Sequence, residues 1–152
     1  MATKIWNESY VNMISMDQSE YMLEKYLSPG SIMGQISEGT VYQFITQREK
    51  DAGFIAYKIN EKELFLSKFY IRKEYRHTGL ATFSLRHIKK IAEGVGLRRI
   101  YLTVNRKNAE AISAYGHWGF VSVEDVDTDI GNGFFMNDHV MELDIKEHND
   151  GI

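Results

Sequence analysis

Apolar positions recur along the first part of the chain with the period of a helix. Up to about Glu38, apolar stripes run through Tyr10, Met13 and Ile14, and then through Tyr21, Met22, Leu23 and Tyr26. Asp17 is the predicted N-cap of the second stripe. Pro29 with Gly30 interrupts the pattern before a short third helix at residues 31–36. The pattern therefore predicts a helical N-terminal segment.

The period then changes to that of β-strands. The runs TVYQFITQ and GFIAYKI predict two strands of a hairpin, with a turn at the charged tetrapeptide Arg48 to Asp51. A third run, ELFLSKFYI, follows a turn at residues 60–62 and alternates well enough to extend the hairpin into a meander.

Helices and strands alternate in the second half. An amphipathic helix ends at Gly94 and Gly96, with its core stripe at Leu80, Phe83, Ile88, Ile91, Ala92 and Val95. The strand RRIYLTV, the helix NAEAISAYGHW and two long strands follow, the last two joined around Gly131-Asn132-Gly133. This order predicts one α/β (α+β) domain over residues 1–152, with a sheet of mixed direction and helices on its faces.

Composition narrows the class of protein. The chain has 152 residues, is 43% hydrophobic, and contains no cysteine, which excludes disulfides, thiolate zinc sites and a Cys nucleophile. The five histidines lack the spacing of known zinc motifs, so no metal is expected. No apolar run has the length of a membrane span or the form of a signal peptide, so we expect a cytoplasmic protein that does not enter a membrane.

Charge is distributed unevenly. The formal net charge is -3, but residues 62–99 hold ten Lys/Arg against three acids, and residues 124–152 hold one Lys against nine acids. The basic segment lacks the interleaved aromatic residues of a nucleic-acid binder, so we expect no nucleic-acid partner. A compact anion such as a phosphorylated cofactor fits it better.

A basic turn between the third strand and the helix is typical of a phosphate site. In Arg76-x-x-Gly79-x-Ala81, small residues let an oxygen approach the free N–H groups of the first helical turn, and Arg76 and His77 add donors. The alternative is an ordinary turn, in which Thr78 caps the helix and Gly79 relieves a tight bend. The P-loop and dinucleotide motifs are absent.

A second group of residues follows about thirty positions later. On a helix starting near Asn108, that residue, Ala111 and Tyr115 share one face. The amide could hold an amide-rich ligand, and the Tyr115 phenol, with a reference pKa near ~10 against ~8.5 for a thiol, could protonate a departing thiolate. The alternative is that Tyr115 is a core aromatic.

These motifs, in this order and followed by Trp118-Gly119-Phe120, resemble the GNAT superfamily of acetyl-coenzyme A-dependent N-acetyltransferases over roughly residues 41–146. The terminal GNGFFMNDHVMEL is also similar to the last hairpin of the polyamine-acetylating, PaiA-like branch. The resemblance implies that acetyl-CoA gives its acetyl group to a primary amine in a direct ternary complex. It also implies a mostly antiparallel sheet in which two central strands splay apart around the thioester.

The resemblance assigns roles position by position. Backbone groups of Phe69, Tyr70 and Ile71 would hold the acetyl carbonyl and the pantetheine, and Asn108 would contact the pantetheine arm. Tyr115 would be the general acid. The pyrophosphate of CoA would lie on Arg76, His77, Thr78, Gly79, Leu80, Ala81 and Thr82.

The sequence departs from the family in two places. Many relatives have a general-base Glu where this chain has Ser67, so the base is open between Glu63, which strand parity places on the side of Ser67 and Phe69, the acids Asp127 and Asp129, and a water chain. The usual N-terminal strand is short or missing, and the sheet edge left exposed predicts a homodimer.

The acceptor has only a weak signature. The acidic residues Glu124, Asp125, Asp127, Asp129 and Asp138 favour a polyamine or another small amine, while protein N-termini and amino sugars stay open. A non-catalytic acyl-CoA-binding module is the alternative that the missing Glu supports, and a nucleic-acid binder is the weakest reading.

Overall fold

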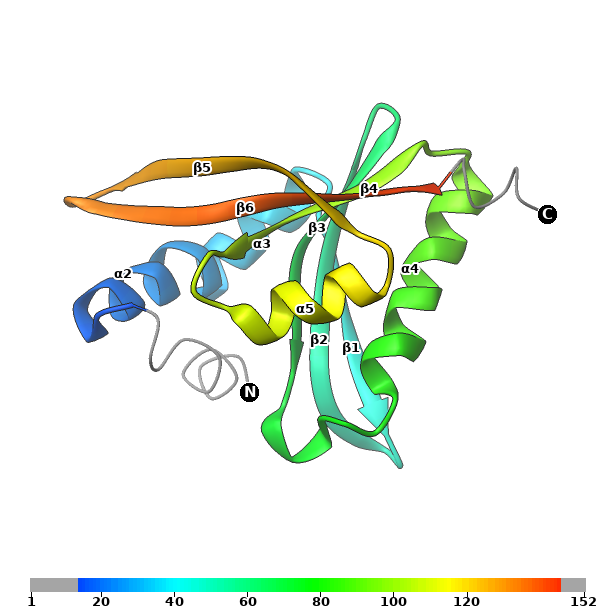
Figure 1. Ribbon diagram of the computed structural model, residues 1–152. Helices are drawn as coiled ribbons and strands as arrows, with labels where there is room; N and C mark the ends of the chain where they lie inside the picture. The colour runs from blue at the N-terminus through cyan, green and yellow to red at the C-terminus, as the bar shows by residue number, and fades with distance from the viewer. Residues whose placement is uncertain (1–13, 146–152) are drawn as a thin grey trace.

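A computed structural model describes residues 14–145 of the chain, and Figure 1 shows how its elements are arranged. Helices α2 and α3 precede three strands, and a 3-10 turn, helix α4, strand β4, helix α5 and two long strands complete the fold. The bounds are α2 Met16–Leu27, α3 Pro29–Ser37, β1 Val41–Gln47, β2 Lys50–Asn60, β3 Glu63–Ile71, η1 Lys73–Tyr75, α4 Leu80–Val95, β4 Arg99–Asn105, α5 Ala109–His117, β5 Val121–Gly131 and β6 Phe134–Asp144.

All six strands form one sheet in the order β1-β2-β3-β4-β6-β5. Every neighbouring pair is antiparallel except β3 and β4, which are parallel because α4 crosses over between them. The predicted α/β (α+β) sheet of mixed, mostly antiparallel direction is therefore confirmed.

Helices cover both faces of the sheet (Figure 1). On one face α4 and α5 pack over the main core, in which Leu64, Ile88 and Ile100 are fully buried. On the other face α2 packs over a smaller cluster around Met22, Phe54 and Ile130. The tip of the β5–β6 hairpin reaches α2, where the Tyr21 hydroxyl donates to the Ile130 carbonyl oxygen (2.6 Å).

Two N-terminal details differ from the sequence prediction. The N-cap of α2 is Ser15, whose side chain accepts from the Gln18 N–H at 3.1 Å, so the prediction of Asp17 as the cap is wrong. Asp17 lies instead in the first turn, where a carboxylate suits the helix dipole. The predicted third helix begins earlier than expected, because Ser28 caps it and Pro29 occupies its first turn.

The two hairpin turns are tight. Strand pairing continues to Gln47 and Lys50, so Arg48 and Glu49 alone form the first turn, with φ of 51° and 65°, in place of the four residues predicted. The turn around Gly131-Asn132-Gly133 is confirmed as the β5–β6 connection. Positive φ at both central positions of each turn matches the twist of the strands.

The predicted absence of an N-terminal strand concerns residues outside those that the structure describes, and so does the stripe at Tyr10 and Met13. In residues 14–145, no helix has the length and apolarity needed to cross a bilayer.

Candidate functional site

The two central strands separate part-way along their length. β3 and β4 pair only from Glu63↔Arg99 to Phe65↔Tyr101. Beyond Phe65, the residues of β3 have no ladder partner on β4 within the described chain, so backbone groups that point toward β4 are left for a ligand. The splaying that the family resemblance implied is therefore present.

A cavity of about 920 Å³ occupies the gap between the separated strands. Its β3 wall runs from Phe65 to Ile71, and its β4 wall from Leu102 to Asn105. It reaches Arg76 and Gly79 on the α4 side of the sheet, and Tyr26 and Gln35 on the α2–α3 side. The cavity thus passes through the sheet, which lets two ligands meet from opposite faces.

A β-bulge at Ser67 shapes the β3 wall. Lys68 pairs with Ala56 and Leu66 with Tyr57, so Ser67 is the extra residue, and its hydroxyl donates to the Ala56 carbonyl oxygen at 3.1 Å. A bulge shifts the alternation of side chains by one position. Leu66 and Phe69 consequently both face the main core, while Lys68 and Tyr70 face α2 and α3.

The bulge overturns the parity argument for Glu63. Phe69 packs with the cluster that contains Leu64, so Glu63 lies on the opposite face from Phe69, and the prediction that they share a side is wrong. Glu63 instead pairs with Arg99 at 3.6 Å, near the other end of the strand.

The basic turn leaves the start of α4 open. Gly79 is the N-cap, with φ of 86° and no side-chain capping bond. The Thr78 hydroxyl donates to the Tyr75 carbonyl oxygen at 2.6 Å, so the alternative in which Thr78 caps the helix is wrong. The N–H groups of the first turn and the positive end of the helix dipole therefore face the cavity mouth without a side-chain cap.

Most of the residues expected at the cosubstrate site line this one cavity. Thr78 and Leu80 belong to the same turn but are not part of the lining. The side chain of Arg76 is partly engaged, since its Nε donates to the Ile71 carbonyl oxygen at 3.0 Å. The expected residues found in the lining are Phe69, Tyr70, Ile71, Arg76, His77, Gly79, Ala81, Thr82, Asn108 and Tyr115.

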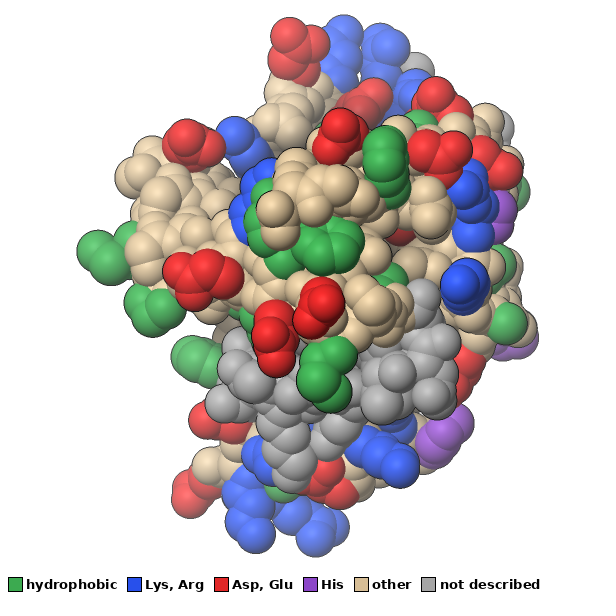
Figure 2. Space-filling model, turned by 90° about the vertical axis from the view of Figure 1, so that its left-hand side faces the viewer, with side chains coloured by type: hydrophobic (Ala, Val, Ile, Leu, Met, Phe, Trp, Pro, Cys, Tyr) green, Lys and Arg blue, Asp and Glu red, His purple; other side chains and the backbone are tan. Residues whose placement is uncertain are grey.

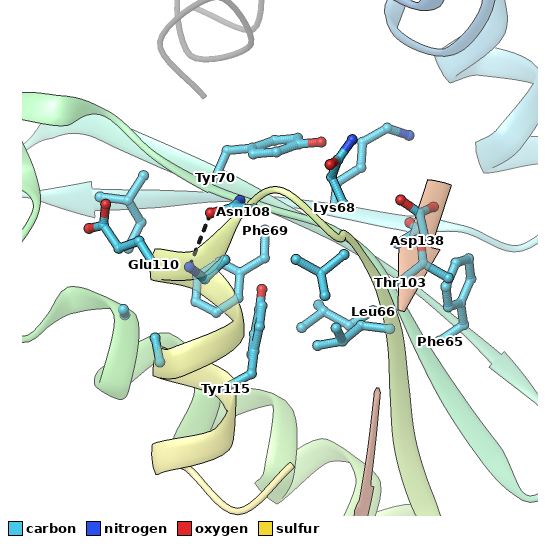
Figure 3. A pocket seen from close by; sticks show the side chains of 18 of the residues that line it. Phe65, Leu66, Lys68, Phe69, Tyr70, Thr103, Asn108, Glu110, Tyr115 and Asp138 are labelled. Atoms are coloured by element: carbon cyan, nitrogen blue, oxygen red, sulfur yellow. Dashed lines mark hydrogen bonds between the residues drawn. The ribbon is translucent and has the colours of Figure 1, made fainter. Parts of the chain in front are cut away.

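Asn108 is the N-cap of α5 and not a residue of the helix face. Its Oδ1 accepts from the Ala111 N–H at 3.1 Å, the bond drawn in Figure 3. This bond fixes the amide plane and leaves the Nδ2 donors at the cavity wall. The side chain can therefore donate to a ligand carbonyl through Nδ2, while its oxygen already accepts one hydrogen bond from the helix backbone.

Tyr115 rises from α5 with its hydroxyl at the cavity, as Figure 3 shows. Its ring is held edge-on by Trp118 at 5.8 Å and Phe120 at 5.5 Å, measured between ring centroids. Tyr115 therefore combines the two roles considered from the sequence. Its ring packs against the main core as a core aromatic does, while its hydroxyl faces the cavity.

Lys68 was missed by sequence reasoning. Its Nζ donates to Gln35 Oε1 (2.9 Å) and to the Tyr42 hydroxyl (2.6 Å), and the Gln35 amide in turn donates to the Tyr26 carbonyl oxygen (3.0 Å). Burial lowers the pKa of Lys68 to about 8 and raises that of Tyr42 to about 12. An amine whose pKa is lowered to about 8 therefore lies on the α2–α3 side of the cavity.

The acids of the final hairpin occupy different environments. Asp127 pairs with Arg106, Asp125 contacts His139 Nδ1 at 2.5 Å, and Asp129 accepts from the Gly131 N–H, all three being exposed. Asp138 is buried and lines the cavity. Within residues 14–145, no group of His, Asp and Glu side chains is arranged to hold a metal ion.

Comparisons with known proteins agree with this geometry. A model of the Acetyltransferase (GNAT) family matches residues 3–120. The chain is 27% identical over 141 residues to the spermidine N(1)-acetyltransferase of Thermoplasma acidophilum, which covers 90% of this chain and 85% of the relative.

Solved structures show the same fold. The PaiA N-acetyltransferase from Thermoplasma acidophilum in complex with coenzyme A has a TM-score of 0.78 and 24% identity, covering 94% of this chain and 87% of that one. A GNAT family acetyltransferase from Elizabethkingia anophelis with acetyl-CoA bound has a TM-score of 0.62 and 10% identity, covering 78% and 86%.

Proposed function

Because the chain belongs to the acetyltransferase (GNAT) family and is an acetyl-CoA-dependent acyltransferase, we propose that it acetylates a small polyamine in a direct ternary complex. The observation that carries the proposal is the cavity that passes through the sheet where β3 and β4 separate. Acetyl-CoA would enter from the α4 side and the amine from the α2–α3 side.

The residues present fit CoA. The uncapped first turn of α4 suits a pyrophosphate, and a Cβ added to Gly79 would meet no protein atom within 4 Å, so an anion can approach the backbone there. The unpaired edge of β3 at Phe69 to Ile71 would bind the pantetheine amides as a neighbouring strand does, and Asn108 Nδ2 would donate to a pantetheine carbonyl.

Catalysis would rest on positioning and proton transfer. Backbone N–H groups of β3 that point toward β4 would polarise the thioester carbonyl. The amine would attack the carbonyl carbon, the C–S bond would break, and the Tyr115 hydroxyl would protonate the departing thiolate. Holding both reactants in one cavity would lower the entropic cost of bringing them together, and the direct transfer needs no covalent intermediate.

The similarity to a spermidine N(1)-acetyltransferase supports a polyamine as the acceptor. Acidic side chains are interspersed with basic ones on the side of the molecule where α2 and the hairpin tip lie (Figure 2), so the charge of this face does not by itself select a polycation. A screen of acetyl-CoA thiol release with polyamines, amino acids, aminoglycosides and short peptides tests the proposal. We expect polyamines to give the highest kcat/KM, and a preference for peptides would contradict it.

Ser67 supports a second candidate, an acyl-CoA-binding module without turnover. Its hydroxyl donates to a backbone carbonyl and cannot act as the carboxylate base of many relatives. Thermal stabilisation by acetyl-CoA without thiol release from any amine in the screen would favour this candidate over the enzyme.

Gly79→Val should raise the Kd for acetyl-CoA about 10-fold, because a branched side chain would fill the space through which an anion approaches the backbone. Isothermal titration calorimetry measures the effect. The matched control is Gly96→Val at the other end of α4, where φ is also positive (80°) and the added Cβ is equally free of contacts. Equal Kd values for the two variants would contradict the pyrophosphate assignment.

Lys68→Met should lower the KM for spermidine about 3-fold at pH 7 by removing a like charge from the cavity. Burial lowers the pKa of Lys68 to about 8, so the side chain is charged below pH 8 and repels a cation, and becomes neutral above it. The difference between parent and variant should therefore disappear by about pH 9.

The control for Lys68 is Lys90→Met, which removes the same charge from the exposed face of α4. KM for spermidine is measured between about pH 6.5 and about pH 9, a range that spans the lowered pKa of Lys68. Parallel profiles for the parent and Lys68→Met would show that the charge of Lys68 does not affect binding of the amine.

A homodimer stays a prediction. β1 is an edge strand of the sheet, and its Phe44 is 68% exposed, which is the kind of edge that a partner subunit covers. Light scattering of the purified chain measures its mass in solution.

A further inference from the structure

Asp138 is a buried carboxylate in the wall of the cavity. It lies on β6 opposite Asn105 of β4, is only 6% exposed, and lines the cavity (Figure 3). Among the described residues, no hydrogen bond or ion pair reaches its side chain. Buried carboxylates are normally paired, so one that faces a cavity without a partner points to a ligand that supplies the partner.

Strand alternation places Asp138 on the acceptor side of the sheet. Phe134 and Met136 pack with the α2 cluster, whereas Met141 and Leu143 belong to the main core beneath α4. Asp138 has the parity of Met136, so it faces α2. The uncapped turn of α4 lies at the opposite face, and the carboxylate is therefore on the side from which the amine would enter.

The neighbouring basic side chains have partners of their own. Arg106 pairs with exposed Asp127, and His139, whose side chain alternates to the other face, contacts Asp125. Lys68 faces the same cavity but donates to Gln35 and Tyr42. Burial raises the pKa of the Asp138 carboxyl, with Arg106 and His139 opposing the rise, so the group is more basic than an exposed aspartate. That is the direction that suits a proton acceptor.

We propose that Asp138 binds the ammonium group of the acceptor and takes its proton, the role that a glutamate at the Ser67 position has in many relatives. This inference rests on the proposed function. The carboxylate removes one proton from R–NH3⁺, and the freed lone pair forms the C–N bond as the C–S bond breaks. The new amide nitrogen loses a second proton, which balances the one that Tyr115 gives to the thiolate. The proton on Asp138 then passes to solvent, so the products are the acetylated amine, CoA thiol and one proton.

Asp138→Asn tests the inference with little change in volume. We expect kcat/KM for spermidine to fall about 30-fold, with the loss of the acid limb of the pH–rate profile, while the Kd for CoA stays at the parent value. The matched control is Asp51→Asn, which removes the same charge from an exposed position on β2 outside the cavity lining, and it should change kcat/KM by less than about 3-fold. Stabilisation of Asp138→Asn by CoA in a thermal unfolding experiment shows that the variant folds. If it does not fold, Asp138→Ser replaces it in the same measurements.

Binding without turnover separates this inference from the proposed function. Spermidine titrated into the protein–CoA complex should bind, and Asp138→Asn should raise its Kd about 10-fold. Parent-like kcat/KM and spermidine Kd in Asp138→Asn would overturn the inference while leaving the acetyltransferase intact. A parent that binds CoA but neither binds nor acetylates spermidine would overturn the polyamine proposal, and Asp138 as its amine site with it.

Discussion

Tyr115→Phe should lower kcat for acetyl transfer by about 100-fold, or about 2.7 kcal/mol in the barrier, because the departing thiolate loses its proton donor. The ring would stay in place, since Trp118 and Phe120 hold it edge-on without using the hydroxyl. The Kd for acetyl-CoA should therefore change by less than about 2-fold. Steady-state thiol release and calorimetry measure the two quantities.

Tyr101→Phe is the matched control for Tyr115. The ring of Tyr101 stacks on Phe65 at 4.8 Å between ring centroids, and Tyr101 is not part of the cavity lining. Removal of the Tyr101 hydroxyl should therefore leave kcat at the parent value. Full activity in Tyr115→Phe would contradict the acid role and would leave thiolate protonation to solvent.

Gly53→Ala should destabilise the protein by about 3 kcal/mol, which corresponds to a fall in Tm of about 10 °C for a domain of this size. A Cβ at this position would lie 2.1 Å from the Tyr70 carbonyl oxygen and 3.0 Å from Ile71 Cα. Both contacts are with the backbone of the neighbouring strand, which cannot move without shifting the β3 wall of the cavity. Affinity for acetyl-CoA should fall together with stability.

Gly94→Ala is the control for Gly53→Ala, because it should change the stability of the protein in the opposite direction. Gly94 lies within α4, and an added Cβ would meet no atom within 4 Å. Replacing a helical glycine by alanine should stabilise the protein by about 0.5–1 kcal/mol. Thermal and urea unfolding measure both variants, and an unchanged Tm in Gly53→Ala would show that β2 and β3 do not need the close approach.

The elements and the basic turn before α4 could be predicted from sequence because their signals are local. The turn from Arg76 to Thr82 lies between a strand and an amphipathic helix, and each of these has its own periodicity. Asn108 was assigned to the site for the same reason. Its role as the cap of α5 was missed, although an asparagine just before a helical run is an ordinary cap signal.

The β-bulge at Ser67 could not be predicted, because it depends on pairing with β2 and not on the sequence of β3 alone. One inserted residue moves every later side chain of β3 to the face opposite the one that simple alternation predicts. Simple alternation therefore places Glu63 on the wrong side and does not identify Lys68. Asp138 was noted only as one acid among several. Its place in the cavity wall requires β6 to pair with β4, a contact between segments that are far apart in the chain.

A crystal structure of the protein with CoA and spermidine tests the central claim, that two ligands meet inside the sheet from opposite faces. The proposed function predicts the pyrophosphate on the first turn of α4, the pantetheine between β3 and β4, and a spermidine amine at the Asp138 carboxylate on the α2–α3 side. Spermidine bound on the α4 side, or CoA bound outside the gap between β3 and β4, would contradict it.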